Sequence, residues 1–200
     1  MGKVKTIIFI ILILWLAVYL FSNIFTIPDL NDKIAIIAIE EPISIGKQQI
    51  PFENQFSSSK IIENLEEAEK DSTVKGIILQ INSPGGTVVA SKEIADKVKS
   101  LNKPVVSWIR EIGTSGAYWI ASSSDKIVAD PLSLTGSIGV ISSYLEFAGL
   151  LENFNVTYQS LSTGKYKEIG SPFKELTQDE RTLIQKKLNK IHDYFVNEVA

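Results

Sequence analysis

Residues 76–86 read GIILQINSPGG, and this stretch sets the fold class that we expect for the whole chain. Its first six residues form an almost continuous apolar run of strand length, which is typical of a strand buried on both faces of a sheet. The proline and two glycines after the run indicate a sharp turn. Residues 87–101 then carry apolar side chains at helical spacing. A buried strand, a turn and an amphipathic helix in succession are the building unit of a parallel α/β sheet.

The same alternation continues on both sides of this unit. The expected strands are residues 34–39, 105–109, 126–129, 138–142 and 156–161, and the expected helices are residues 60–70, a segment that opens at Ser115, residues 146–153 and residues 179–199. The apolar run at 34–39 indicates a second strand covered on both faces. Residues 42–57, with two prolines and a glycine, predict a loop. This order of strands and helices predicts an α/β domain with a largely parallel sheet.

The composition excludes several classes of site. The 200 residues contain no cysteine, which rules out thiol nucleophiles, disulfides and thiolate zinc sites. The single histidine, His192, rules out a multi-histidine metal site. The net charge is −3 with both signs interspersed, and no basic stripe points to nucleic acid. We therefore expect one domain of ordinary size with no metal site, no cofactor and no nucleic-acid partner.

The N-terminal residues 6–25 read TIIFIILILWLAVYLFSNIF, an uncharged apolar run long enough to span a bilayer. Two lysines precede the run and two aspartates follow it, so the positive-inside rule places the N-terminus in the cytoplasm and the remaining chain outside. A cleaved secretory signal is the alternative, but residues 22–24 make a poor cleavage site. We expect residues 1–27 to be a retained anchor and residues 28–200 to form an extracytoplasmic domain.

Ser115 is the first candidate for chemistry, within residues 113–119, which read GTSGAYW. A serine at a helix start is often only an N-cap. Here glycines stand close on both sides, so the backbone can approach a substrate closely. The helix start also offers a positive dipole end and unpaired N–H groups, which can hold the oxyanion of a tetrahedral intermediate. The pattern favours a nucleophile.

Two further turns carry candidate groups. Residues 83–86, SPGG, follow a strand, and ligands of α/β domains bind at the carboxyl ends of strands. The N–H groups of Gly85 and Gly86 are therefore candidates for binding a carbonyl or an oxyanion. Residues 135–139, TGSIG, contain Ser137, whose hydroxyl can orient a neutral lysine by hydrogen bond. In both cases a plain turn is the alternative.

A general base for the serine has to come from a lysine or from His192. A neutral lysine is required, and a reference pKa near 10.4 leaves only about one lysine in 2,500 neutral at pH 7. Lowering the pKa by about three units takes on the order of 4 kcal/mol of desolvation. Lys165 and Lys167 share a face of an extended segment, so these residues alone do not choose between them. His192 flanks an apolar helical stripe without a glycine-rich turn, which makes a serine–histidine triad the weaker alternative.

With these segments in order, the chain resembles the signal peptide peptidase A family, membrane-anchored Ser–Lys peptidases with a ClpP/crotonase-like fold. The matching segments are the N-terminal anchor and residues 82–86, 113–119, 125–129, 134–139 and 163–172. The resemblance implies repeated β-β-α units, Ser115 as nucleophile and Lys167 as general base, because the family pattern Gly-x-x-Lys-(Asp/Glu)-Ile places the base there. It also implies that Ser137 hydrogen-bonds the lysine and that the amide of Gly116, with that of Gly85 or Gly86, forms the oxyanion hole.

The same resemblance implies an endopeptidase that cleaves residual signal peptides and other hydrophobic segments outside the cytoplasm, and that assembles into homo-oligomeric rings with serine and lysine on neighbouring protomers. Short bacterial members continue further, and the helical pattern here runs to Ala200 without a cap signal, so we expect the domain to be incomplete at its C-terminus. The alternatives are a stomatin-directed membrane-bound ClpP-class peptidase, a crotonase-type acyl-CoA enzyme, and an inactive peptide-binding scaffold.

Overall fold

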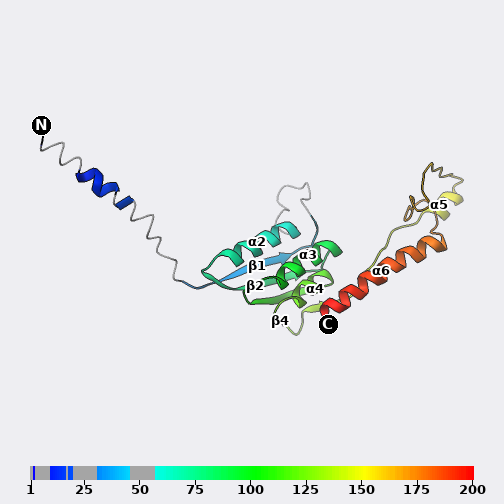
Figure 1. The fold of residues 1–200 in the computed structure, drawn as a ribbon. Helices are drawn as coiled ribbons and strands as arrows, with labels where there is room; N and C mark the ends of the chain where they lie inside the picture. The colour runs from blue at the N-terminus through cyan, green and yellow to red at the C-terminus, as the bar shows by residue number, and fades with distance from the viewer. Residues whose placement is uncertain (1, 3–9, 17, 20–30, 46–56) are drawn as a thin grey trace. The chain divides into compact units, whose positions relative to one another are not determined.

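The computed structural model describes residues 2, 10–16, 18–19, 31–45 and 57–200 (Figure 1). The chain divides into two units, Met1–Lys33 and Ile34–Ala200. In the first unit, residues 10–16 and 18–19 are helical and exposed, while the remainder of the expected membrane span at 6–25 lies outside the described residues. Among the described residues, no helix combines the length and the apolar character that crossing a bilayer requires.

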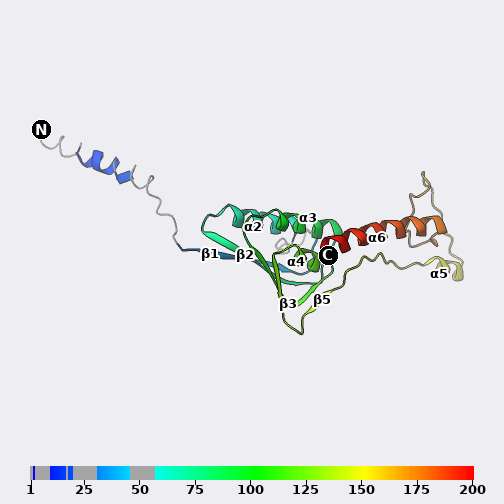
Figure 2. The same ribbon diagram turned by 60° about the horizontal axis from the view of Figure 1, so that its bottom comes forward.

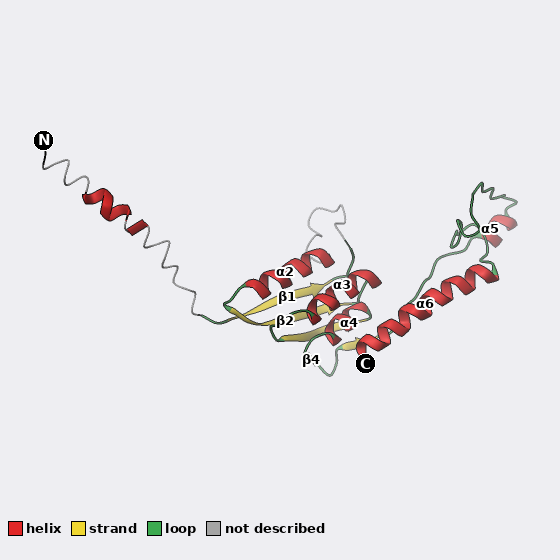
Figure 3. Cartoon of the chain, viewed as in Figure 1, coloured by secondary structure: helices red, strands yellow, loops and turns green. Residues whose placement is uncertain are grey.

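From residue 33 onward, strands and helices alternate (Figures 1 and 3). The elements are β1 (Lys33–Glu40), α2 (Ser58–Lys70), β2 (Val74–Ser83), α3 (Val88–Lys99), β3 (Val105–Thr114), α4 (Gly116–Ser122), β4 (Lys126–Ala129), β5 (Leu134–Gly136), α5 (Ala148–Asn153) and α6 (Gln178–Val199). The expected loop at 42–57 lies mostly outside the described residues, but Ile43 forms an isolated bridge with Gly86. The predicted α/β architecture is confirmed.

The sheet has the order β1-β2-β3-β4, and the described pairings of β3 are all parallel. Strand β3 has two neighbours on one side: its first half pairs with β4, and its second half pairs with β5 through Ile112↔Leu134 and Thr114↔Gly136. The long strand therefore leaves β4 behind and continues beside β5. This extension ends at Thr114, so Ser115 follows directly after the part of β3 that pairs with β5.

Helices α2, α3 and α4 cover one face of this sheet (Figure 2). Their inward side chains interlock with those of the strands, because the apolar residues recur every three or four positions in the helices and every second position in the strands. The fully buried side chains of this core are Ile39, Ile61, Leu65, Ile77, Leu79, Ile81, Ile94, Ile109 and Ile120. The core thus holds β2 and β3, the two strands that lead to the candidate turns, against α3 and α4.

The prediction that residues 34–39 are covered on both faces is wrong for the described part of the chain. Ile37 and Ile39 are buried, but Ile34 and Ile36 are 56% and 63% exposed. Alternate residues of a strand point to opposite faces, and the described helices cover only one of them. The continuous apolar run therefore predicts a strand here, but it does not predict how many faces of that strand are covered by other elements.

The strands predicted at 138–142 and 156–161 are also wrong, because neither segment is paired with a neighbouring strand. Both belong to residues 137–177, which we call the arm. Its apolar side chains are largely exposed, with Ile141 at 88% and Leu161 at 104% of full exposure. A strand needs a partner for its N–H and C=O groups, and the described chain supplies none to these residues.

Helix α6 is attached to the core near its C-terminal end. Phe195 is 2% exposed and stacks on Trp119 of α4 with ring centroids 4.8 Å apart. At the other end, Thr177 and Glu180 form a capping box, and Lys174 Nζ lies 2.6 Å from Glu180 Oε1. The cap fixes the point where the arm turns into the helix.

We predict that this cap stabilises the protein in a pH-dependent way. The hydrogen bond from Lys174, followed by that from the Thr177 N–H, lowers the pKa of Glu180. A lowered folded-state pKa adds stability above the ordinary glutamate value of about 4.3, and this contribution is lost as the pH falls through the folded value. Urea unfolding should therefore show Glu180→Gln less stable than the parent at pH 7, with the difference shrinking towards pH 3.

The exposed Glu175 lies outside the capping box and supplies the matched control. Glu175→Gln should change the free energy of unfolding much less than Glu180→Gln at pH 7. A Glu180→Gln effect that is the same at both pH values would contradict an ionic role for this cap.

Candidate active site

Ser115 lies at the junction between β3 and α4 in a strained backbone conformation. Its φ of 53° and ψ of −125° fall in a region that residues with a side chain rarely adopt. The Ser115 N–H donates to the Gly136 carbonyl at 2.8 Å, which anchors the junction to β5. The hydroxyl makes no capping hydrogen bond to α4. The simple N-cap interpretation of this serine therefore loses its main support.

Glycines let the turn after β2 and the start of α4 touch through their backbones. A Cβ on Gly85, whose φ is +98°, would lie 2.7 Å from the Gly116 nitrogen and 2.9 Å from Ser115 Cβ. A Cβ on Gly116 would lie 2.1 Å from Ser91 Oγ. Real Cβ atoms do not approach other atoms so closely, so both positions need glycine. The approach brings the SPGG turn against the serine.

This contact leaves two N–H groups free beside Ser115. The Gly85 N–H donates to Ser83 Oγ at 3.2 Å. The N–H groups of Gly86 and Gly116 donate no hydrogen bond to any described residue. The Gly86 nitrogen lies 3.4 Å from the position that a Cβ on Gly116 would occupy, so the two free amides are near each other. Of the two turn glycines, Gly86 is the one with an available donor.

Ser137 also comes to the same place. It follows Gly136, which pairs with Thr114, so it stands beside Ser115 across the β3–β5 pair. Its φ is 55° and its side chain is exposed. The bifurcated sheet thus brings together three segments that the sequence separates: the SPGG turn, Ser115–Gly116 and Ser137.

A small apolar cavity adjoins Ser115. Its space, about 20 Å³, has room for roughly one water molecule. The apolar side chains that line it are Val88, Trp119, Val140, Ile191 and Phe195. Two of these five residues come from α6, so the end of α6 that is packed on the core also closes the surroundings of the serine.

Lys167 lies elsewhere, on an exposed turn of the arm. Its neighbour Lys165 forms an ion pair with Asp179 at 2.7 Å, which ties this turn to the start of α6. Ile191, which lines the serine cavity, stands twelve residues after Asp179 in the same helix, about 18 Å away at 1.5 Å per residue. The structure does not bring Lys167 to Ser115 within one chain.

Two family models match this chain. The model described as "Peptidase family S49" matches residues 97–200, and the model described as "Clp protease" matches residues 31–136. The chain belongs to peptidase family S49. Together, the two matches cover the sheet, the serine turn and the arm of this S49 peptidase.

Relatives agree with this assignment. A candidate signal peptide peptidase, SppA, from Enterococcus faecium is 36% identical over 174 residues, which are 85% of this chain and 51% of the relative. A candidate protease from Methanocaldococcus jannaschii is 42% identical over 138 residues, 68% of this chain and 44% of the relative. Protease 4 of Haemophilus influenzae is 31% identical over 86% of this chain and 28% of its own length. The S49 chain thus spans about half or less of the length of these relatives.

His192 of the S49 peptidase is exposed on α6 and does not line the serine cavity, although its neighbour Ile191 does. The geometry therefore gives no support to a serine–histidine triad. Among the described residues, no group of three or more His, Asp or Glu side chains is arranged to hold a metal ion.

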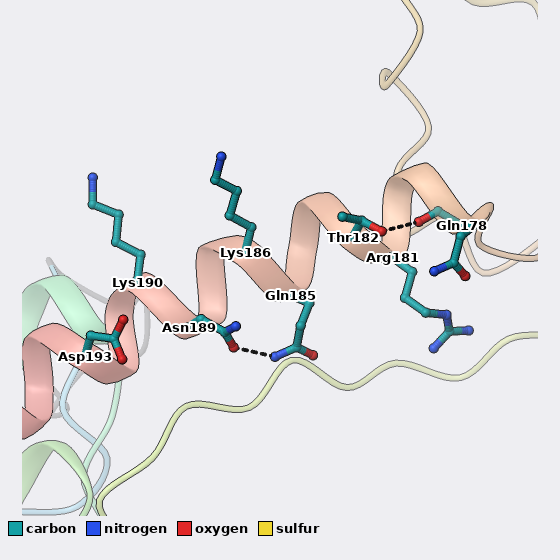
Figure 4. A pocket seen from close by; sticks show the side chains of 8 residues that line it. All are labelled: Gln178, Arg181, Thr182, Gln185, Lys186, Asn189, Lys190 and Asp193. Carbon is teal, nitrogen blue, oxygen red and sulfur yellow. Dashed lines mark hydrogen bonds between the residues drawn. The ribbon is translucent and has the colours of Figure 1, made fainter.

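A hollow of about 680 Å³ along α6 is not a reaction site either. All of its lining residues come from α6, and Lys186 and Lys190 point away from Arg181 into open space (Figure 4). Side chains that fan out from one helix do not converge on a substrate.

Sequence reasoning missed the segment Glu41–Ser44, which we call the strap. Ile43 donates its N–H to the Gly85 carbonyl at 2.8 Å and accepts from the Thr87 N–H at 2.9 Å. A Cβ on Gly86 would lie 1.9 Å from the Ile43 carbonyl oxygen. Residues 42–44 of the strap were predicted as part of the loop at 42–57, and no local pattern indicates that the strap pairs with the SPGG turn.

We predict that Gly116→Ala destabilises the protein by about 1–3 kcal/mol through overpacking against Ser91. Ser91→Ala should relieve part of this cost, so a double-mutant cycle should show coupling between the two positions. Gly149→Ala is the matched control, because a Cβ there meets nothing within 4 Å. Additive effects of Gly116→Ala and Ser91→Ala on urea unfolding would show that the close contact is absent.

Proposed function

We propose that this chain contains the catalytic part of a membrane-anchored serine endopeptidase that uses a Ser115–Lys167 dyad on residual signal peptides and other hydrophobic segments. The observation that carries the proposal is Ser115 itself: its backbone is strained, its hydroxyl does no capping, and two free N–H groups lie beside it. Strain of this kind costs on the order of 1–3 kcal/mol and persists where the surrounding structure enforces it.

In the proposed reaction, neutral Lys167 takes the proton from the Ser115 hydroxyl as its oxygen attacks the scissile carbonyl carbon. The carbonyl oxygen gains the negative charge and accepts hydrogen bonds from the Gly86 and Gly116 N–H groups. Collapse of this intermediate breaks the peptide bond, and the lysine passes its proton to the leaving amine. Water then attacks the acyl-enzyme with the lysine as base, which restores the serine. Ser137 orients the lysine throughout.

The choice of Lys167 over Lys165 has physical support. A hydrogen bond from Lys165 to Asp179 raises the pKa of Lys165. This interaction holds Lys165 protonated and removes it further from the neutral form that a general base requires. The ion pair also engages the Lys165 amine at the start of α6.

The separation of Lys167 from Ser115 supports a site shared between copies of the chain in a homo-oligomeric ring. The arm that carries Lys167 buries few of its apolar side chains in its own chain. Its exposed large apolar residues are Ile138, Ile141, Tyr144, Leu145, Phe147, Leu150, Phe154, Val156, Tyr158, Leu161, Tyr166 and Phe173. Exposed apolar side chains in such number favour a contact with a neighbouring copy, and a copy that covers the arm also receives the lysine.

The proposal for the whole protein includes a cytoplasmic N-terminus, an anchor within residues 1–27 and an extracytoplasmic domain of ClpP/crotonase-like β-β-α units from residue 28. The uncharged run at 6–25 and the charges that flank it support this topology. The hydrophobic peptide substrates are supported by the relative from Enterococcus faecium, whose name describes a signal peptide peptidase.

We predict that Ser115→Ala and Lys167→Ala each lower kcat on an apolar peptide by several orders of magnitude, because either change removes a reacting group. Lys165→Ala is the matched control and should keep most of the activity. The activity of the parent should rise with pH, because a lysine general base acts in its neutral form. If Lys165→Ala is the inactive variant, or a folded Ser115→Ala protein stays within tenfold of the parent, the assignment is wrong.

Mixing two inactive variants tests the shared site. Oligomers assembled from equal amounts of Ser115→Ala and Lys167→Ala chains should regain activity, because about one junction in four pairs an intact serine with an intact lysine. Turnover would be measured before and after subunit exchange, and mixing confirmed by mass spectrometry of the assembled species. Mixed oligomers without recovered activity would place the complete dyad within one protomer.

A further inference from the structure

Ser83 stands at the centre of the hydrogen bonds that shape the SPGG turn. Its side chain is fully buried. The hydroxyl accepts the Gly85 N–H at 3.2 Å and donates to the Glu41 carbonyl oxygen at 2.6 Å. One hydroxyl can serve as donor and acceptor at once. Ser83 therefore links the glycine turn to the strap, two segments that are distant in the sequence.

The strap holds the next peptide group, the one between Gly85 and Gly86. Ile43 donates its N–H to the Gly85 carbonyl at 2.8 Å, and its own carbonyl accepts the Thr87 N–H at 2.9 Å. Glu41, the partner of Ser83, stands at a φ of 57°, so the strap begins at a residue in a rarely adopted conformation. These contacts fix the residues on both sides of Gly86.

The direction of the Gly86 N–H follows from the planarity of the peptide bond. In a trans peptide, the C=O of Gly85 and the N–H of Gly86 lie in one plane and point in opposite directions. The Gly85 carbonyl points to Ile43, so the Gly86 N–H points away from the strap. Gly116 lies near that nitrogen, and its own N–H is also free.

We propose that Ser83 is a positioning residue: its hydroxyl holds the Gly85 N–H and the start of the strap, and the strap holds the Gly85–Gly86 peptide plane so that the Gly86 N–H points to the oxyanion of the reaction. This inference rests on the proposed function. Removal of the hydroxyl leaves the buried Gly85 N–H and the Glu41 carbonyl without their partner. The cost of these unsatisfied buried groups favours a shift of Gly85 and of the strap, and such a shift turns the Gly85–Gly86 plane and its Gly86 N–H away from the oxyanion.

Peptidase kinetics of the full chain test this role. We expect Ser83→Ala to lower kcat on the order of 10- to 100-fold, somewhat less than the 10²–10³-fold typical for complete loss of an oxyanion donor. KM should change less than about twofold, since the donor acts in the transition state. The inhibition constant of a peptide aldehyde, which forms a tetrahedral adduct with serine, should rise in parallel, while that of the matching peptide alcohol should not.

Ser107→Ala is the matched control, because Ser107 is also fully buried and its hydroxyl also has a partner, Ser124 Oγ at 2.7 Å. Both substitutions should lower the melting temperature. Only Ser83→Ala should change the ratio of the inhibition constant of the peptide aldehyde to that of the peptide alcohol, which we call the aldehyde-to-alcohol ratio. If Ser83→Ala does not fold, the nearly isosteric Ser83→Cys, with its weaker donor and acceptor, should show a smaller shift of the same ratio.

Two outcomes overturn the inference and are distinguishable. In the first outcome the parent is active, and the folded Ser83 variant has the same kcat and the same aldehyde-to-alcohol ratio as Ser107→Ala. This result shows that the Ser83 hydroxyl only stabilises the core. A parent without Ser115-dependent turnover overturns the proposed function, and the positioning role of Ser83 falls with it.

Discussion

The close backbone contact between the turn after β2 and the start of α4 is the constraint on which the candidate site depends. A Cβ on Gly85 or Gly116 would occupy space already taken by Ser115 or Ser91. The contact exists because β2 and β3 are parallel neighbours, with Ser83 in register with Gly113. Two chain segments that leave the same edge of a sheet side by side meet at their turns, and only small residues let the turns touch.

The rest of the site follows from this contact and from the bifurcated pairing of β3. The strap and Ser83 hold one turn, and the Gly136 carbonyl holds the Ser115 N–H on the other. The donors beside the serine are backbone amides fixed by buried strands and helices, so they need little reorganisation to stabilise a developing charge. The packing of α2, α3 and α4 against the sheet thus fixes the positions of these few N–H groups.

The arm differs from the sheet and its helices in how few of its apolar side chains are buried. Residues 137–177 carry many apolar side chains but bury few of them, and the two strands predicted there find no partner. The turn with Lys167 is held at the start of α6, whereas Ile191 and Phe195 of the same helix close the serine cavity. A rigid helix of this length keeps the two ends apart. The backbone donors and the lysine are therefore positioned by separate parts of the molecule.

The sequence by itself determined the strands at 34–39, 76–81, 105–109 and 126–129, the helices between them, and the glycine-flanked serine, because periodicity and glycine placement act over a few residues. It also carried the resemblance that the family match bears out. Only the tertiary structure decided that one sheet face stays uncovered in the described chain, that Gly86 rather than Gly85 has the free N–H, and that the strap and Ser83 hold the turn. The strap and the turn pair through residues about forty positions apart, and no local pattern in the chain encodes such a pairing.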